Sequence, residues 1–125
     1  MAGPKGSKYY DIFLDYSIQL NHRKKGSIMT SLHFSLLNAI HNMGSIKEAA
    51  EHLNISYRKA WGIIQKMEEQ LGFNLLNRQR GGNQGGKTSL TNDGLNLITA
   101  HKELREEFDK SIHDMTKKFF HELNK

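Results

Sequence analysis

The first patterned stretch of the chain alternates between apolar and polar residues. From Ile12 to Leu20 every second side chain is apolar or aromatic, and a period of two residues is typical of a half-buried β-strand. Residues 21–26 are polar and include three adjacent cations, and residues 27–30 can return as a second strand. The pattern therefore predicts a hairpin with a basic tip over residues 12–30, preceded by a flexible leader over residues 1–11.

From residue 31 the apolar spacing becomes helical. A stripe from Leu32 to Ile40 ends before Gly44, a residue that commonly terminates helices. Ser45 begins the sequence Ser-Ile-Lys-Glu, in which the serine hydroxyl can cap a second helix. After Asn54, which tolerates left-handed geometry, Ser56 can cap a third helix that closes at Gly72. Two helices separated by three residues predict a helix-turn-helix.

A glycine-rich basic loop follows the third helix. Residues 73–76 are a candidate strand, residues 79–87 form the loop, and residues 88–90 can return as the paired strand, which together make a wing. From Thr91 a long helix is expected to run nearly to Lys125. Its stripe of apolar residues has the spacing of a helix that packs along a partner helix: Leu97, Leu104, Phe108, Ile112, Met115 and Phe119.

These elements predict a single mainly α, α+β domain over residues 1–125. Its parts are the leader, the hairpin, a winged helix-turn-helix over residues 31–90, and a C-terminal dimerisation helix over residues 91–125. We expect a homodimer, because an exposed apolar stripe would be an aggregation hazard for a monomer. The predicted interface comprises Leu104, Phe108, Ile112, Met115 and Phe119.

Charge and composition narrow the class of function. The chain carries 18 Lys and Arg against 13 Asp and Glu, and residues 1–90 hold twelve of the basic and six of the acidic side chains. The basic excess therefore belongs to the hairpin, helix-turn-helix and wing, which favours a polyanionic partner. The absence of cysteine excludes disulfides and thiolate metal sites. With no apolar run long enough to span a bilayer, we expect a cytoplasmic protein that binds no membrane.

The third helix carries the residue types that read DNA. Ala60, Ile64 and Met67 share one face, so Arg58 and Gly62 point away from the core, where Arg58 can donate two hydrogen bonds to guanine. A glycine there lets the backbone approach a groove. The alternative to DNA contact is an amphipathic helix whose polar face meets only solvent. The predicted contacts to double-stranded DNA are Ser45, Lys47, Ser56, Tyr57, Arg58, Lys59, Gly62, Lys66, Arg78, Arg80, Gly81, Gly82, Gly85, Gly86 and Lys87.

The wing loop also matches a nucleotide-binding pattern. Residues 81–88 fit G-x-x-x-x-G-K-[ST], the phosphate loop of nucleotide hydrolases, but no series of βαβ units surrounds it. The seven histidines are scattered, and the pair Glu68 and Glu69 is expected to be a solvated face, not an acid and base couple. We therefore expect no enzyme, no catalytic residues, no metal and no cofactor.

The assembled motifs resemble a known family. Gly44-Ser45-Ile46, the helix start Ser56-Tyr57-Arg58-Lys59-Ala60-Trp61 and the Gly-Gly-x-x-Gly-Gly wing over residues 81–86 are similar to the N-terminal DNA-binding domain of ModE-type regulators. The related LysR-type pattern is also visible in residues 71–78 and 90–94. The resemblance implies a winged helix-turn-helix that dimerises through flanking helices and places its third helix in the major groove.

The resemblance also sets limits. ModE-type members that sense molybdate do so with separate domains after the DNA-binding domain, and no stretch up to Lys125 resembles one, so we expect no molybdate effector on this chain. A sequence-specific DNA-binding transcriptional regulator is the leading hypothesis. A winged-helix protein–protein adaptor without DNA binding is the main alternative, and a nucleotide hydrolase using residues 81–88 is the other. Salt dependence of DNA affinity separates the first two.

Overall fold

The computed structural model describes residues 4–77 and 87–124. It divides into two compact units. The central unit is Ile18–His101, and the terminal unit combines the described residues up to Ser17 with those from Lys102 onward. The long helix α4 (Asn92–Leu123) contributes its first turns to the central unit and its remainder to the terminal unit.

A short hairpin opens the central unit. Strand β1 (Leu20–His22) pairs antiparallel with β2 (Gly26–Met29), with an irregular register after Leu20. The prediction of a hairpin is confirmed, but the first strand predicted over residues 12–20 is wrong in position, because only its last residue enters the ladder. Among residues 12–19, all of which are described, Phe13 alone takes part in an isolated β-bridge, and the others have no strand assignment.

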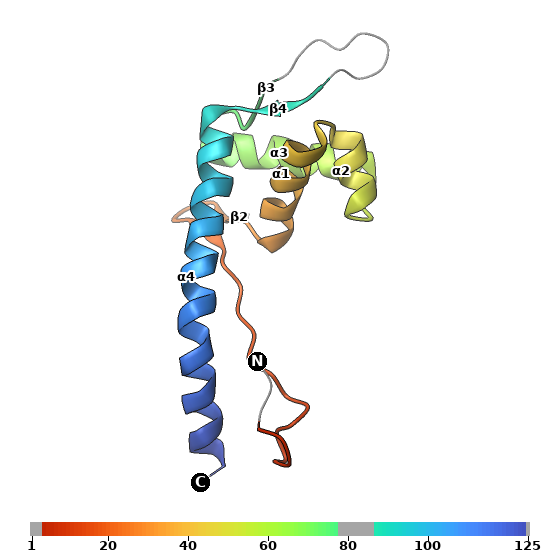
Figure 1. The fold of residues 1–125 in the computed structure, drawn as a ribbon. Helices are drawn as coiled ribbons and strands as arrows, with labels where there is room; N and C mark the ends of the chain where they lie inside the picture. Colours follow the sequence, from red (N-terminus) through yellow and green to blue (C-terminus); the bar gives the residue numbers. More distant parts are fainter. Residues whose placement is uncertain (1–3, 78–86, 125) are drawn as a thin grey trace. The chain divides into compact units, whose positions relative to one another are not determined.

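Three helices follow and gather in the central unit (Figure 1): α1 (Ser31–Met43), α2 (Ile46–His52) and α3 (Tyr57–Leu71). The predicted stops are confirmed. Gly44 and Gly72 follow α1 and α3 in the left-handed region, at φ 68° and 84°. In that region a side chain would crowd the following carbonyl, so the chain turns most readily at glycine.

The core of the central unit lies among these helices. It is formed by apolar side chains from all three helices, β2 and the base of the wing, and Leu36, Leu37, Ile40, Ala49, Ala60 and Ile64 are among its most deeply buried members. On its margin, the ring of Phe34 stacks on His101 of α4 with centroids 3.8 Å apart. The apolar stripes read from the sequence are thus the faces by which the helices pack.

The wing begins and ends in a two-residue ladder. Strand β3 (Leu76–Asn77) pairs antiparallel with β4 (Ser89–Leu90), and Leu76 and Leu90 face each other in the register. The first of these strands lies later than the predicted residues 73–76. Both leucines are buried, so the ladder is attached to the core at its apolar end.

The terminal unit is formed by the N-terminal segment and the later turns of α4. The hydroxyl of Tyr16 donates to the Asp109 carboxylate, and its ring lies 5.8 Å from that of Phe108. Tyr9 packs in the same way near Phe120, at 6.1 Å between centroids. The period-two pattern of residues 12–20 therefore partly reflects packing on a helix and not pairing with a strand. No helix within residues 4–77 and 87–124 has the length and apolar character needed to cross a membrane.

Candidate nucleic-acid interface

The helix-turn-helix is held by two serine caps. The Ser45 hydroxyl accepts from the backbone N–H of Glu48 at 3.2 Å, and the Ser56 hydroxyl accepts from that of Lys59 at 3.0 Å. Between the two helices, Asn54 adopts the left-handed conformation at φ 58°. The predicted caps and the predicted left-handed asparagine are all present, so α3 begins at a fixed place relative to α2.

Helix α3 buries one face and exposes the other. Ala60, Ile64 and Met67 are buried, whereas Arg58, Lys59 and Lys66 are exposed. Tyr57 is 51% exposed and meets the edge of Trp61 at 6.2 Å in a T-shaped contact. The predicted division of this helix into a core face and a free face is confirmed.

Gly62 lies on the exposed face without a structural need for glycine. Its φ is not positive, and a Cβ built at this position would meet no other atom within 4 Å. Glycine in a helix costs about 1 kcal/mol relative to alanine. The fold therefore gives no visible reason for glycine at this position. A binding partner that must approach the helix backbone closely would give one.

The wing is tied to the helix-turn-helix at its base. The N–H of Thr88 donates to the carbonyl of Gly44 at 2.9 Å, which joins the returning strand to the turn between α1 and α2. Lys87 is exposed beside it, and Lys47 is exposed on α2. The remaining predicted wing contacts lie outside the described residues: Arg78, Arg80, Gly81, Gly82, Gly85 and Gly86.

Glu68 positions the start of the wing, and this role was not predicted from the sequence. It is 8% exposed, and its carboxylate accepts from the backbone N–H groups of Leu75 at 2.8 Å and Leu76 at 3.3 Å. The expectation that Glu68 is solvated is therefore wrong. The available clue was its spacing, four residues after the buried Ile64 and thus on the core face of α3.

The end of the wing is fixed by Thr91 and Gly94. The Thr91 hydroxyl donates to the Asn74 carbonyl at 2.8 Å and accepts from the Gly94 N–H at 3.1 Å. A Cβ on Gly94 would lie only 2.6 Å from the Leu75 carbonyl oxygen. This glycine, unlike Gly62, is required because the segment that leads into β3 passes directly against the helix.

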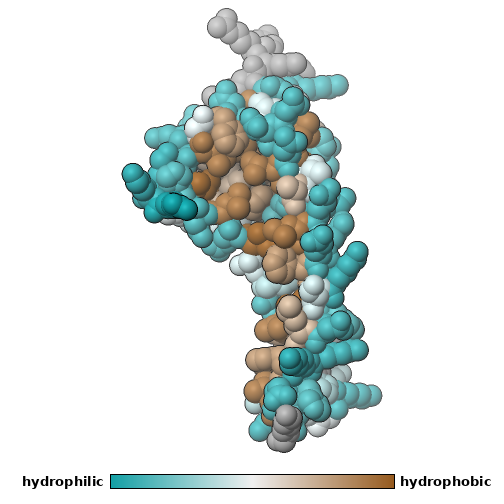
Figure 2. Space-filling view, turned by 90° about the vertical axis from the view of Figure 1, so that its left-hand side faces the viewer, coloured by the Kyte–Doolittle hydropathy of each residue, from teal (hydrophilic) through white to brown (hydrophobic). Residues whose placement is uncertain are grey.

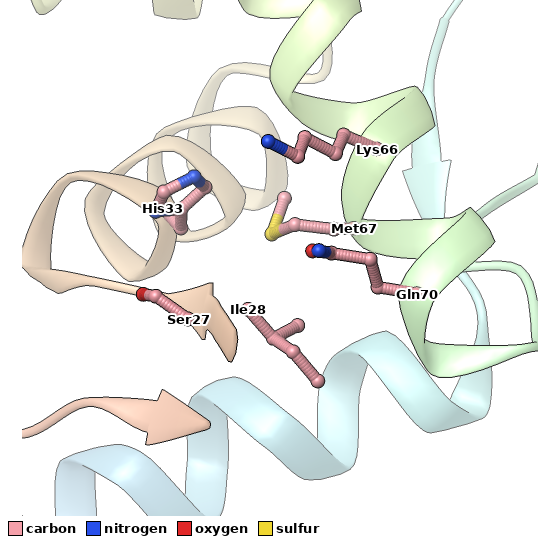
Figure 3. A pocket seen from close by; sticks show the side chains of 6 residues that line it. All are labelled: Ser27, Ile28, His33, Lys66, Met67 and Gln70. Carbon is pink, nitrogen blue, oxygen red and sulfur yellow. The ribbon is translucent and has the colours of Figure 1, made fainter. Parts of the chain in front are cut away.

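Lys66 lies at the edge of the exposed face of α3. It reaches toward His33 of α1 across a pocket that both residues line (Figure 3). Burial and the Lys66 charge lower the pKa of His33. Lys66 therefore lies toward the hairpin side of α3, apart from the position of Arg58 two turns earlier on the helix.

The predicted dimer residues lie along α4 in the terminal unit. Leu104, Phe108, Met115 and Phe119 are 41–57% exposed, and Ile112 is intermediate. In the lower part of Figure 2, apolar side chains gather along this region of the surface. Phe120 and Thr116, on the neighbouring side of the helix, are 2% and 1% exposed, so the exposed stripe lies beside a covered one.

The described residues bear on two other chemistries, and residues 81–86 of the phosphate-loop match lie outside them. Their strands form two antiparallel two-stranded sheets, without the parallel sheet that surrounds the phosphate loop of a nucleotide hydrolase. Among these same residues, no three His, Asp or Glu side chains come together as a metal site.

Comparisons with known proteins match the helix-turn-helix part of the chain. The sequence profile of the bacterial regulatory helix-turn-helix proteins of the lysR family matches residues 32–95. The molybdenum transport protein ModE of Azotobacter vinelandii is 33% identical over 87 residues, which is 70% of this chain and 32% of that protein. The DNA-binding transcriptional dual regulator ModE of Escherichia coli K12 is 38% identical over 72 residues, 58% of this chain and 28% of that one. This chain thus spans about a third of the length of these relatives.

Solved structures agree on the fold. The DNA-binding domain of CbnR, crystallised with DNA, aligns with 70% of this chain and 94% of that one, at a TM-score of 0.56 and 22% identity. The DNA-binding domain of BenM with benA site 1 DNA aligns with 70% of this chain and 92% of that one, at a TM-score of 0.54 and 25% identity. The predicted winged helix-turn-helix architecture is confirmed.

Proposed function

Because the chain belongs to the lysR family of bacterial regulatory helix-turn-helix proteins, we propose that it binds double-stranded DNA as a transcriptional regulator, with α3 in the major groove. The observation that carries the proposal is the exposed face of α3, where Arg58 and the glycine at position 62 share one side of the helix. Arginine can donate two hydrogen bonds to the O6 and N7 atoms of guanine. A bare backbone at Gly62 lets the helix lie deep in the groove.

The groups around α3 suit the DNA backbone. Ser45 and Ser56 accept hydrogen bonds from their own helices, and each hydroxyl can still donate its hydrogen to a phosphate oxygen. Tyr57, Lys47 and Lys59 are exposed near the same helix starts. We assign these residues, with Lys66, to phosphate contacts that fix the position of α3.

The wing supplies a second set of contacts in this proposal. Lys87 is exposed at the described end of the wing, and the Thr88 bond to Gly44 holds that end close to the helix-turn-helix. The cations and glycines over residues 78–86 would follow the backbone or minor groove next to the site read by α3. Contacts of this kind add affinity without discriminating between sequences.

A second copy of the chain is the proposed partner along α4. The exposed stripe from Leu104 to Phe119, with Leu123 at 39% exposure, lies in the terminal unit together with the exposed side chains of Ile12 and Phe13. So much exposed apolar surface in one small unit favours burial against a symmetry mate. A two-fold dimer presents two copies of α3 to half-sites roughly 34 Å apart, or a multiple of that spacing.

The direct test is a DNA titration with the full chain and a duplex selected by the protein from a random library. Arg58→Ala is expected to reduce the free-energy difference between specific and non-specific DNA binding by about 1–3 kcal/mol. Lys87→Ala should weaken both classes alike and reduce the salt slope by about one. Lys110→Ala, which removes an exposed cation of the terminal unit, is the matched control. An unchanged specificity ratio for Arg58→Ala would rule out its role in base reading.

The dimer is tested separately by sedimentation. The double variant Phe108→Glu with Ile112→Glu should sediment as a monomer and lose operator affinity while its helix-turn-helix stays folded. A wild-type chain that sediments as a monomer at micromolar concentration, or a double variant with undiminished affinity, would contradict the assembly and leave the assignment of α3 in place.

A further inference from the structure

A pocket on the hairpin side of α3 joins Lys66, which the proposed function assigns to a phosphate contact, to residues of β2 and α1 that have no role in that function. It has a volume of about 210 Å³ and lies within the central unit, between β2, α1 and α3. Its apolar floor is formed by Ile28 and Met67, both buried. Lys66 and Gln70 of α3 extend toward His33 of α1 above that floor, with Ser27 at the rim (Figure 3).

The polar groups of this pocket are mainly donors. The backbone N–H of Thr30 donates to Nδ1 of His33 at 2.9 Å, so Nδ1 is the acceptor and the neutral ring carries its proton on Nε2. Nε2–H is therefore a donor. Lys66 offers an ammonium group, Gln70 an amide, and Ser27 a hydroxyl, and the six lining residues include no carboxylate.

The charge around the pocket is positive. Lys66 extends toward the His33 ring (Figure 3), and burial together with the Lys66 charge lowers the pKa of His33. A second cation lies at the margin, because Nζ of Lys25 at the hairpin tip donates to the Gln70 carbonyl at 3.2 Å. The same bond holds the hairpin tip against the last turn of α3, so the pocket wall has a fixed position.

We propose that this pocket binds one tetrahedral oxyanion of the phosphate class, held by the Lys66 ammonium group, the His33 Nε2–H and the Gln70 amide. The donors come from two helices and surround one position, which suits a group with several acceptor oxygens. The volume fits such a group but is below the roughly 300 Å³ at which pockets for larger organic ligands begin. The anion is either free phosphate or a phosphate of the DNA backbone, and the site extends beyond the contacts proposed for DNA reading.

The first experiment uses the full chain without DNA. Its thermal unfolding is followed in increasing inorganic phosphate against chloride at equal ionic strength. We expect a saturable rise in Tm of roughly 5 °C at ten times the dissociation constant. The rise should disappear in Lys66→Gln and persist in Lys110→Gln, which loses the same charge on the terminal unit. A wild-type Tm that does not respond to phosphate, or a rise that persists in Lys66→Gln, would overturn the site.

The second experiment identifies the source of the anion. The phosphate titration is repeated with the protein saturated by its selected duplex. If the pocket holds a backbone phosphate, the duplex abolishes the phosphate-dependent rise in Tm, and if it holds a free anion, the rise is retained. Both results presuppose the saturable rise of the first experiment. Because that experiment contains no DNA, failure of the anion site and failure of DNA binding are separate outcomes.

Discussion

The substitution Gly62→Ala should change the stability and the DNA affinity of this protein in opposite directions. In the free protein a Cβ at position 62 meets nothing within 4 Å, and the backbone is in the ordinary helical region. Alanine reduces the conformational freedom of the unfolded chain and adds no clash. The free energy of unfolding should therefore rise by about 0.5–1 kcal/mol, and the Tm by about 2–6 °C.

On DNA the same methyl group occupies the position where α3 is proposed to approach the groove most closely. Extra volume in a packed contact typically costs about 1–3 kcal/mol, which corresponds to roughly 5- to 150-fold in the dissociation constant. The measurements are calorimetric unfolding of the free variant and a fluorescence-anisotropy titration of the selected duplex. A more stable variant with weaker DNA binding is the expected pair of results.

Gly94→Ala is the control for this reasoning. Its Cβ would lie 2.6 Å from the Leu75 carbonyl oxygen and 3.2 Å from Cβ of Leu90, so it should destabilise the free fold by about 1–3 kcal/mol. A Gly62→Ala protein with raised Tm and unchanged DNA affinity would refute the placement of this face of α3 in the groove. A lowered Tm would refute the claim that position 62 is open.

Three further substitutions test local features of the structure. His33→Gln keeps a residue able to complete the capping box of α1 but removes the titrating ring. Since the folded pKa of His33 is lowered, its contribution to stability is complete above the unfolded value of about 6.5 and is lost as the pH falls. The Tm of the wild type should thus fall more steeply than that of the variant between pH 7 and 5, and parallel curves would contradict this. Glu68→Ala should lower the free energy of unfolding by about 1–3 kcal/mol in urea titrations, because two buried N–H groups lose their acceptor, and a loss below 0.5 kcal/mol would count against its positioning role. Asn54→Ala should cost about 1 kcal/mol in the same assay because of its left-handed backbone, whereas Asn54→Gly should not.

The helices and their ends could be predicted from the sequence because local interactions determine them. Ser45, Ser56, Gly44 and Gly72 each act within four residues of their own position, through a cap or a left-handed turn. The apolar stripes were sufficient to identify the core face of α3. The same local reasoning placed the exposed residues of the candidate DNA-reading face.

The wrong predictions concern residues whose surroundings are formed by distant parts of the chain. The alternation before Leu20 has the period of a strand, but Tyr16 packs on a helix about ninety residues later in the sequence. Periodicity reports which side chains are covered and not what covers them. Glu68 was misjudged for a similar reason, because its acceptor role depends on where the chain returns after Gly72.

The bond between Thr88 and Gly44 has a consequence for the order in which the protein folds. The caps of α2 and α3 close within a single turn, whereas this bond joins the returning wing strand to a turn formed much earlier in the chain. Loop-closure entropy must be overcome before such a contact contributes. We therefore expect the three helices to assemble first and the pairing of the two short strands to form late. Amide hydrogens at Thr88 and Thr91 should accordingly exchange with solvent sooner than that of Ala60 in the middle of the core.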